Sequence, residues 1–148
     1  MGTRTIVRQV EIPADAGLIY EYLTTGEKLE GWFPGRAKTD PKVGGEYHFT
    51  FLAEGSVDHE RTGKFTRLDP GEIVEYTWDF GAGETTVRFD ITRNGNGSKV
   101  GLKHSGFGQG SEIDEAYTMH DQGWNLFLRN LASVIDGAKD LRKELGFA

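Results

Sequence analysis

SEIDEAYTMHDQGWNLFLRNLASVIDGAKDLRKEL, residues 111–145, is the stretch whose pattern decides the fold. Apolar side chains recur in it every three or four residues, which is the spacing of one face of an α-helix. We therefore predict one long amphipathic helix from Ser111 to Leu145, with Ser111 as its N-cap and Gly146 as its C-terminal stop. Gly123 and Gly137 are expected to bend or weaken it. The apolar stripe of such a helix requires a large apolar surface to cover it.

The chain before this helix supplies that surface as a series of strands. Apolar and polar residues alternate in several short segments, which is the pattern of half-buried β-strands. Turn signals, such as Asp69–Gly71 and Asn94–Gly97, separate neighbouring segments and favour antiparallel hairpins. The predicted strands are Thr3–Ile12, Glu46–Leu52, Arg61–Leu68, Ile73–Phe80, Thr85–Thr92 and Lys99–His104.

Two short helices are predicted after the first strand. Pro13 ends that strand, and Asp15 is a suitable N-cap for a helix over Ala16–Leu23. A second helix over Glu27–Trp32 is expected to stop before Pro34 and Gly35. The sequence thus predicts an α+β fold in which a curved antiparallel sheet wraps around the long C-terminal helix. No repeat or linker divides residues 1–148, so we expect a single domain.

Composition excludes several classes of protein. The 148 residues include no Cys, which excludes disulfides, thiolate zinc sites and cysteine nucleophiles. The formal net charge is −6, which disfavours a nucleic-acid partner. No apolar run approaches the ~20 residues of a membrane span, and the N-terminus has no signal core, so we expect no membrane insertion and a cytoplasmic location. No phosphate loop or dinucleotide motif is present, and we expect no cofactor.

Several motifs resemble those of a known family. They are Ile12–Tyr20 with Lys28–Phe33, Asp40–Tyr47, Gly63–Phe65 with Ile73–Trp78, and Leu102–Phe107 with His120–Trp124 and Leu128–Leu131. In this order they resemble the START/Bet v 1-like superfamily, in the branch related to the C-terminal domain of the Hsp90 ATPase activator. The resemblance implies the helix-grip fold, in which a bent sheet grips a long helix. Related proteins bind lipids, sterols, flavonoid-like molecules or polyketides.

The candidate ligand-binding residues are the aromatic and histidine side chains expected between the sheet and the helix. His104 shares its strand face with Val100 and Leu102, and His120 precedes Trp124 by about one helical turn. Each of these side chains could equally belong to a solid core, and that alternative stays open. The set is Trp32, Phe49, Phe51, Phe65, Tyr76, Trp78, Phe89, His104, Tyr117, His120 and Trp124.

The other two histidines are not candidates. His48 lies on the face opposite Tyr47 and Phe49 and is expected to face solvent, whereas His59 is expected in a charged loop. No zinc-binding motif occurs, so no metal site is predicted. No paired carboxylates or nucleophile–base set stand out, so no catalytic residue is predicted.

Two functions from different classes follow. The favoured hypothesis is that a cavity between sheet and helix binds a small hydrophobic molecule, such as a lipid, a polyketide or a flavonoid-like compound. The alternative, implied by the resemblance, is a protein-interaction module or regulator of a chaperone such as Hsp90. A cyclase or hydrolase is less favoured than either, because no paired carboxylates or nucleophile–base set stands out in the sequence.

Overall fold

A computed structural model of the chain describes residues 4–53, 56–81 and 83–142. Its helices and strands follow the order expected from the sequence, with one additional strand. In chain order they are β1 (Arg4–Ile12), α1 (Ala16–Thr24), α2 (Gly26–Leu29), β2 (Arg36–Thr39), β3 (Glu46–Ala53), β4 (Ser56–Asp69), β5 (Ile73–Asp79), β6 (Glu84–Asn94), β7 (Gly97–Phe107) and α3 (Ser111–Ile135).

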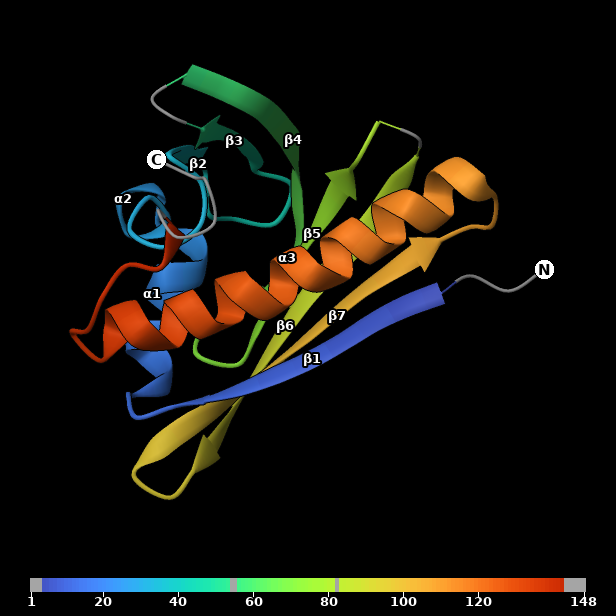
Figure 1. Cartoon of the computed structure of the whole chain (residues 1–148). Coiled ribbons are helices and arrows are strands. Elements are labelled where there is room, and N and C mark those ends of the chain that lie inside the picture. Colours follow the sequence, from blue (N-terminus) through green and yellow to red (C-terminus); the bar gives the residue numbers. More distant parts are fainter. Residues whose placement is uncertain (1–3, 54–55, 82, 143–148) are drawn as a thin grey trace.

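The strands form one antiparallel seven-stranded sheet in the order β1-β7-β6-β5-β4-β3-β2. Register shifts at Phe51/Leu52 and Phe65/Arg67 bend it, as bulges do. Figure 1 shows α3 lying across one face of this curved sheet, with α1 and α2 grouped at one end. The predicted α+β helix-grip fold is therefore confirmed.

Alternation along the strands places apolar side chains against α3, as predicted. In β5, Val74, Tyr76 and Trp78 are buried and the residues between them are partly exposed. Asp15 caps α1 by accepting a hydrogen bond from the backbone N–H of Gly17 at 2.9 Å, also as predicted. The edge strand β2 was not predicted, because four residues, RAKT, are too short to show a period of two. Strand β4 begins five residues before the expected Arg61 because its first residues pair with β3.

The prediction that the last helix reaches Leu145 is wrong. Helix α3 ends at Ile135, and Gly137 follows with a φ of 76°, a left-handed conformation that glycine adopts without steric cost. Gly137 therefore performs the termination that was expected of Gly146, which lies outside the described residues, as do Thr3 and residues 143–145. At the other end the N-cap is Gly110, without a side-chain hydrogen bond, and Ser111 is the first helical residue.

A buried asparagine holds the chain that follows α3 against the body of the protein. Asn130 is 0% exposed; its amide donates to the carbonyl of Trp32 at 2.9 Å and its oxygen accepts from the N–H of Leu141 at 2.7 Å. Arg142 donates to the carbonyl of Pro34 at 2.9 Å and pairs with Asp140 at 2.7 Å. The segment after α3 is thus hydrogen-bonded to the turn that follows α2.

Replacing Asn130 by Ala is expected to lower the free energy of unfolding by about 2–4 kcal/mol, because it leaves the buried Trp32 carbonyl and Leu141 N–H without their partner. Urea unfolding followed by circular dichroism measures the change. The matched control is Asn125→Ala, at an exposed position of the same helix, which should change stability by less than about 0.5 kcal/mol. Equal effects of the two substitutions would contradict the role given to Asn130.

Candidate functional site

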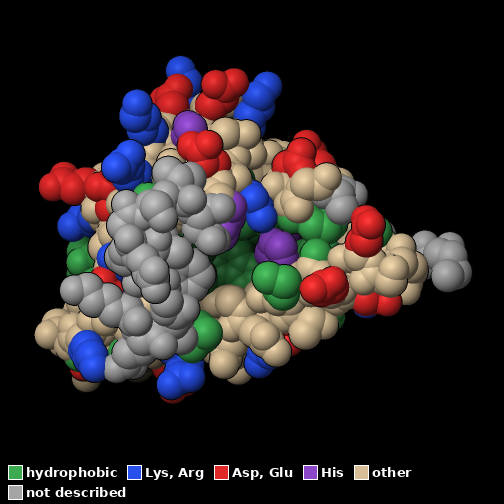
Figure 2. Space-filling model, turned by 45° about the horizontal axis from the view of Figure 1, so that its top comes forward, with side chains coloured by type: hydrophobic (Ala, Val, Ile, Leu, Met, Phe, Trp, Pro, Cys, Tyr) green, Lys and Arg blue, Asp and Glu red, His purple; other side chains and the backbone are tan. Residues whose placement is uncertain are grey.

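A hollow of about 380 Å³ opens between α3 and the strands β3, β4 and β5. Figure 2 shows it from outside, with hydrophobic side chains on its floor and histidine and basic side chains beside it. Its wall is mainly aromatic. The residues that line it are Phe33, Phe51, His59, Arg61, Trp78, Met119, His120, Gly123, Trp124 and Phe127.

Phe33 lies at the centre of the aromatic wall. Its ring centroid is 5.1 Å from that of Trp124 and 4.9 Å from that of Phe127, and it packs edge-on against Phe51 at 5.1 Å. The turn after α2 brings Phe33 here, since its backbone N–H donates to the carbonyl of Leu29 at 2.9 Å. The wall therefore joins residues from three separate parts of the chain.

The polar side of the hollow comes from β4. The His59 ring stacks on that of Phe51, its cross-strand neighbour, with centroids 4.5 Å apart and an interplanar angle of 13°. The Arg61 guanidinium lies over the Trp78 ring, 5.7 Å from its centroid. The prediction that His59 sits in a charged loop is thus wrong. Pairing with β3 places His59 in strand β4, and its side chain lines the hollow.

A chain of hydrogen bonds joins α3 to the sheet through His104, which is 0% exposed. Its Nδ1 accepts from the Trp124 indole at 2.9 Å, so its Nε2 carries the proton and donates to Thr85 at 2.6 Å. The Thr85 hydroxyl then donates to the carbonyl of Trp78 at 2.7 Å. Burial, and secondarily the nearby His120, lower the pKa of His104 to about 3, so its imidazole is neutral at physiological pH.

His120 is held in the opposite tautomer. Its Nε2 accepts from the Trp78 indole at 3.1 Å, and its Nδ1–H donates to the carbonyl of Ala116 at 2.7 Å, one turn earlier in α3. Burial lowers the pKa of His120. The hydrogen bond to the Ala116 carbonyl partly offsets this lowering, and the positive charge of Arg61 adds to it. Both inward histidines therefore use both ring nitrogens within the protein.

Of the eleven candidate residues, Phe51, Trp78, His120 and Trp124 line the hollow. Phe49, Phe65, Tyr76 and Phe89 are buried core residues, and His104 lies behind the wall. Trp32 is also buried; it packs on Phe33 and donates its indole N–H to the carbonyl of Tyr22 at 2.8 Å. Tyr117 lies beside Phe107 and under the Arg4 guanidinium instead.

Six further residues line the hollow but are not among the candidate ligand-binding residues: Phe33, His59, Arg61, Met119, Gly123 and Phe127. A signal for His59 and Arg61 existed: they share the parity of the buried Phe65, so extending strand 61–68 backwards places both on the inner face. The charges around them concealed that alternation. Gly123 gives no periodic signal, because it contributes space rather than a side chain.

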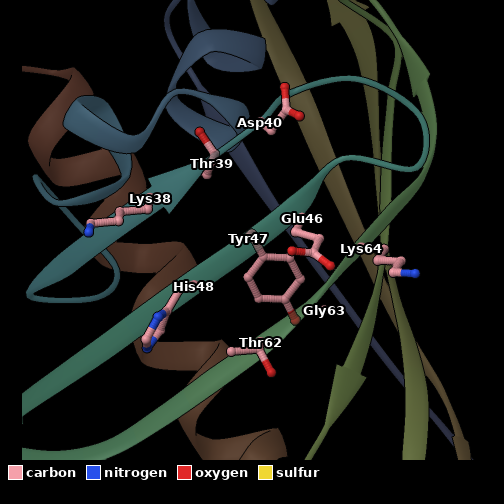
Figure 3. Close-up of a pocket in the computed structure, with 9 residues that line it drawn as sticks. All are labelled: Lys38, Thr39, Asp40, Glu46, Tyr47, His48, Thr62, Gly63 and Lys64. Carbon is pink, nitrogen blue, oxygen red and sulfur yellow. The ribbon is translucent and has the colours of Figure 1, made fainter.

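A second depression, of about 630 Å³, lies over strands β2, β3 and β4. Figure 3 shows the side chains around it, which include Lys38, Asp40, Glu46 and Lys64. Side chains of both charges line it, and its tyrosine, Tyr47, is buried and donates its hydroxyl to the carbonyl of Thr77. This depression lacks the apolar wall that a hydrophobic ligand needs. His48, also on its border, is exposed as predicted and pairs with Glu60 at 2.8 Å.

The sheet, the long helix and the hollow between them define a helix-grip protein. The family model that matches residues 13–136 is described as activator of Hsp90 ATPase homolog 1-like protein, and the chain belongs to this family. A comparison with curated proteins found no match.

Solved structures share the fold. The Aha1 dimer from Colwellia psychrerythraea is similar with a TM-score of 0.79 and 21% identity, over 92% of this chain and 98% of that one. Protein CV1439 from Chromobacterium violaceum gives 0.73 and 25%, over 89% and 96%. CalU16 from Micromonospora echinospora gives 0.75 and 18%, over 93% and 78%.

Two further features bear on partners and cofactors. Within residues 4–53, 56–81 and 83–142, no helix is long and apolar enough to cross a membrane. In the same described part of the chain, no group of three or more His, Asp or Glu side chains is placed to hold a metal ion.

The burial of His104 is expected to make the free energy of unfolding depend on pH. Because its pKa is lower in the folded state than the ordinary value near 6.5, the unfolded chain binds more protons between about pH 6.5 and pH 3. Its contribution is fully present above that window and is lost as the pH falls, by about 5 kcal/mol in total. Urea unfolding from pH 7.5 to 4 measures the slope.

Long-range ¹H–¹⁵N NMR checks the same group directly. His104 should remain the neutral tautomer protonated on Nε2 at pH 5, and His104→Gln should reduce the pH dependence of stability. An imidazolium signal from His104 at pH 5 in the folded protein would contradict the assigned hydrogen bonds.

Proposed function

We propose that this protein binds a small hydrophobic molecule in the hollow between α3 and the sheet. The observation that carries the proposal is the aromatic wall around a space of about 380 Å³. Ligand sites are mostly apolar concavities of roughly 300–1,000 Å³ with a few polar groups. The hollow meets this description, with His59 and Arg61 as polar groups at one side.

The shape of the wall favours ligands with rings. Phe33, Trp78 and Trp124 offer ring faces, because the planes of Phe33 and Trp78 differ by 24° and those of Phe33 and Trp124 by 30°. Rings that stack or meet edge to face gain energy beyond area burial. Polyketides and flavonoid-like compounds fit such a wall, and DynU16, a structural neighbour with a TM-score of 0.74, is described as a protein of the dynemicin biosynthetic locus.

A panel titration tests the proposal. Purified protein is titrated with fatty acids, sterols, flavonoids and aromatic polyketides, while NMR follows the indole N–H signals of Trp78 and Trp124 and the amide of Gly123. Both indoles are hydrogen-bonded to histidines beside the hollow, so an occupant should shift these signals in a saturable way. A flat response to every compound would reject the proposal.

Filling the hollow is expected to abolish binding without unfolding the protein. A Cβ added at Gly123 meets no atom within 4 Å, and the residue lines the hollow, so Gly123→Leu places a side chain in the ligand's space. Removing a glycine from a helix interior also favours folding by about 0.5–1 kcal/mol. Affinity for the best compound should fall at least tenfold, measured by tryptophan fluorescence.

The matched control is Gln122→Leu, which adds the same side chain at the adjacent exposed position outside the hollow. This variant should bind the compound as the wild type does. Loss of binding in both variants, or in neither, would contradict a site at the hollow.

A second candidate function is regulation of a chaperone, which the family's description as activator of Hsp90 ATPase homolog 1-like favours. Its test is the ATPase rate of purified Hsp90 with and without this protein, together with co-purification in moderate salt. Gly123→Leu separates the two functions, because a surface contact with Hsp90 should survive a substitution that only fills the hollow. An unchanged ATPase rate and no co-purification would reject this candidate.

A further inference from the structure

The two edges of the sheet differ in how they are protected from pairing with another chain. At one edge, β2 is only four residues long and carries Arg36 and Lys38, and a short basic edge strand discourages pairing. At the other edge, β1 runs for nine residues, and its register with β7 is unbroken from Thr5 to Ile12. That stretch contains no Pro and no Lys. Figure 1 shows β1 beside α3 at this margin of the sheet.

The hairpin between β6 and β7 fixes which backbone groups of β1 point outward. Its two-residue loop is closed by the Asn94–Gly97 pair, whose backbone groups bond to each other. The bonding direction alternates along a strand, so the backbone of the next residue, Ser98, is directed at β1, where it pairs with Ile12. Ile12 and every second residue before it therefore bond to β7.

The intervening residues of β1 direct their backbone N–H and C=O groups away from the sheet. The carbonyl of Thr5 is one of these groups, and it accepts a hydrogen bond from the Tyr117 hydroxyl of α3 at 3.4 Å. Within the described part of the chain, the outward backbone groups of the next three residues have no partner: Val7, Gln9 and Glu11. Such a row of unpaired donors and acceptors is what an additional β-strand bonds to.

A groove of about 520 Å³ lies beside this edge, between residues 7–10 of β1 and the flank of α3. Val10 and Leu128 give it apolar wall, and Asn125 and Arg129 complete its helical side. The groove shares no lining residue with the hollow. A strand edge beside a helix is a geometry in which domains capture extended peptides, with main-chain hydrogen bonds giving affinity and side-chain contacts giving specificity.

The charges of the groove favour an acidic occupant. No Asp or Glu is among the residues that line it. Arg8 is neutralised by Asp121, to which it donates two hydrogen bonds of 2.9 Å. Arg129 is exposed, and no acidic side chain among residues 4–53, 56–81 and 83–142 pairs with it. Its guanidinium is therefore available to a carboxylate that enters the groove.

A second copy of β1 fits this edge less well. In a two-fold antiparallel pair, facing residues lie on the same side of the sheet, so their numbers are both odd or both even. Arg4 and Arg8 therefore cannot face Glu11, the acidic residue of β1. Pairing about Val7 or about Arg8 places Arg8 opposite Ile6 or opposite its own copy. A different chain that brings a carboxylate matches the groove better.

We propose that an extended segment of a partner protein adds to β1 as a further strand and lies in the groove beside α3. Its backbone bonds to the outward groups of β1, and it turns apolar and acidic side chains towards α3. The apolar side chains contact Val10 and Leu128, and a carboxylate pairs with Arg129. This interaction surface is separate from the hollow and does not depend on the ligand-binding function proposed above.

Amide hydrogen exchange of the free protein tests whether the edge is open. The N–H groups of Val7, Gln9 and Glu11 should exchange at least about a hundredfold faster than those of Arg8 and Val10, which bond to β7. Light scattering should give the mass of a monomer. Protection of the outward amides that grows with protein concentration would show that a second copy occupies the edge, and protection at every concentration would show that the edge is closed. Either result would overturn the proposal.

Selection from a phage-displayed library of random eight-residue linear peptides tests the occupant. Enriched sequences should alternate apolar with other residues and carry Asp or Glu. The best peptide is synthesised together with a version in which amides replace its carboxylates. Fluorescence anisotropy measures both against wild type, Val7→Pro, Arg129→Gln and two controls. The controls are Val7→Thr, which keeps a β-branched residue with its N–H, and Arg93→Gln, at an exposed arginine outside the groove.

Val7→Pro should lower affinity about tenfold or more, because it removes an outward N–H that the peptide needs, and an edge strand tolerates proline there. Val7→Thr should bind as the wild type does. Arg129→Gln should weaken the acidic peptide about three- to fivefold and leave the amide version unchanged, whereas Arg93→Gln should change neither. Circular dichroism checks that each variant is folded, and Gln9→Pro repeats the test at the next outward N–H.

The contrary outcomes are separable. No enriched peptide, or equal binding to Val7→Pro and Val7→Thr, would reject strand addition at β1. Equal effects of Arg129→Gln and Arg93→Gln would reject the acidic partner. Affinity for hydrophobic compounds should be the same in Val7→Pro as in wild type, so failure of the peptide site and failure of the hollow are observed independently.

Discussion

The hydrogen bond from the Trp124 indole to Nδ1 of His104 joins α3 to the sheet, and much of the surrounding structure depends on it. It sets the tautomer of His104, which in turn donates to Thr85 and through it engages the carbonyl of Trp78. A buried imidazole without these partners would carry the full cost of its desolvation. With these hydrogen bonds made, the His104 imidazole fixes the position of α3 along the sheet and helps to hold Trp78 and Trp124 in the wall of the hollow.

The hollow exists because the side chains that α3 presents to the sheet change from large and apolar to small or exposed along the helix. Towards the C-terminal end of α3, Leu128 and Leu131 are buried, so the helix and sheet meet as a filled core. One turn and more before them stand Gly123, which has no side chain, and Met119, which is 65% exposed. Beside this part of the helix lies the hollow, which is lined by the rings of Phe33, Phe51 and Trp78. The filled core and the hollow thus lie against different parts of the same helix.

The chain belongs to the activator of Hsp90 ATPase homolog 1-like family, and this arrangement of sheet and helix agrees with that membership. Family membership does not identify a ligand. A helix-grip fold supplies a concave sheet and a covering helix, and the side chains at the hollow determine what is bound. In this protein those side chains are aromatic faces beside an arginine.

Much of the fold could be predicted because each signal is local. The alternation in residues 73–80 and the stripe between Ile113 and Ile135 are properties of consecutive residues, and they determine which face of each element is apolar. The end of α3 could not be predicted this way. Apolar spacing continues to Leu141, yet the chain turns at Gly137 because Asn130, Trp32 and Leu141 meet in the folded protein.

The candidate site was predicted only in part, for the same reason. By itself the sequence determined that aromatic residues and two histidines face the interior, because parity along a strand or helix selects a side. Only the tertiary structure decided which of them border empty space, since that depends on how far the sheet bends from α3. It also decided that His104 and His120 form hydrogen bonds with tryptophans, and that Arg61 and Gly123, which no apolar pattern marks, line the hollow.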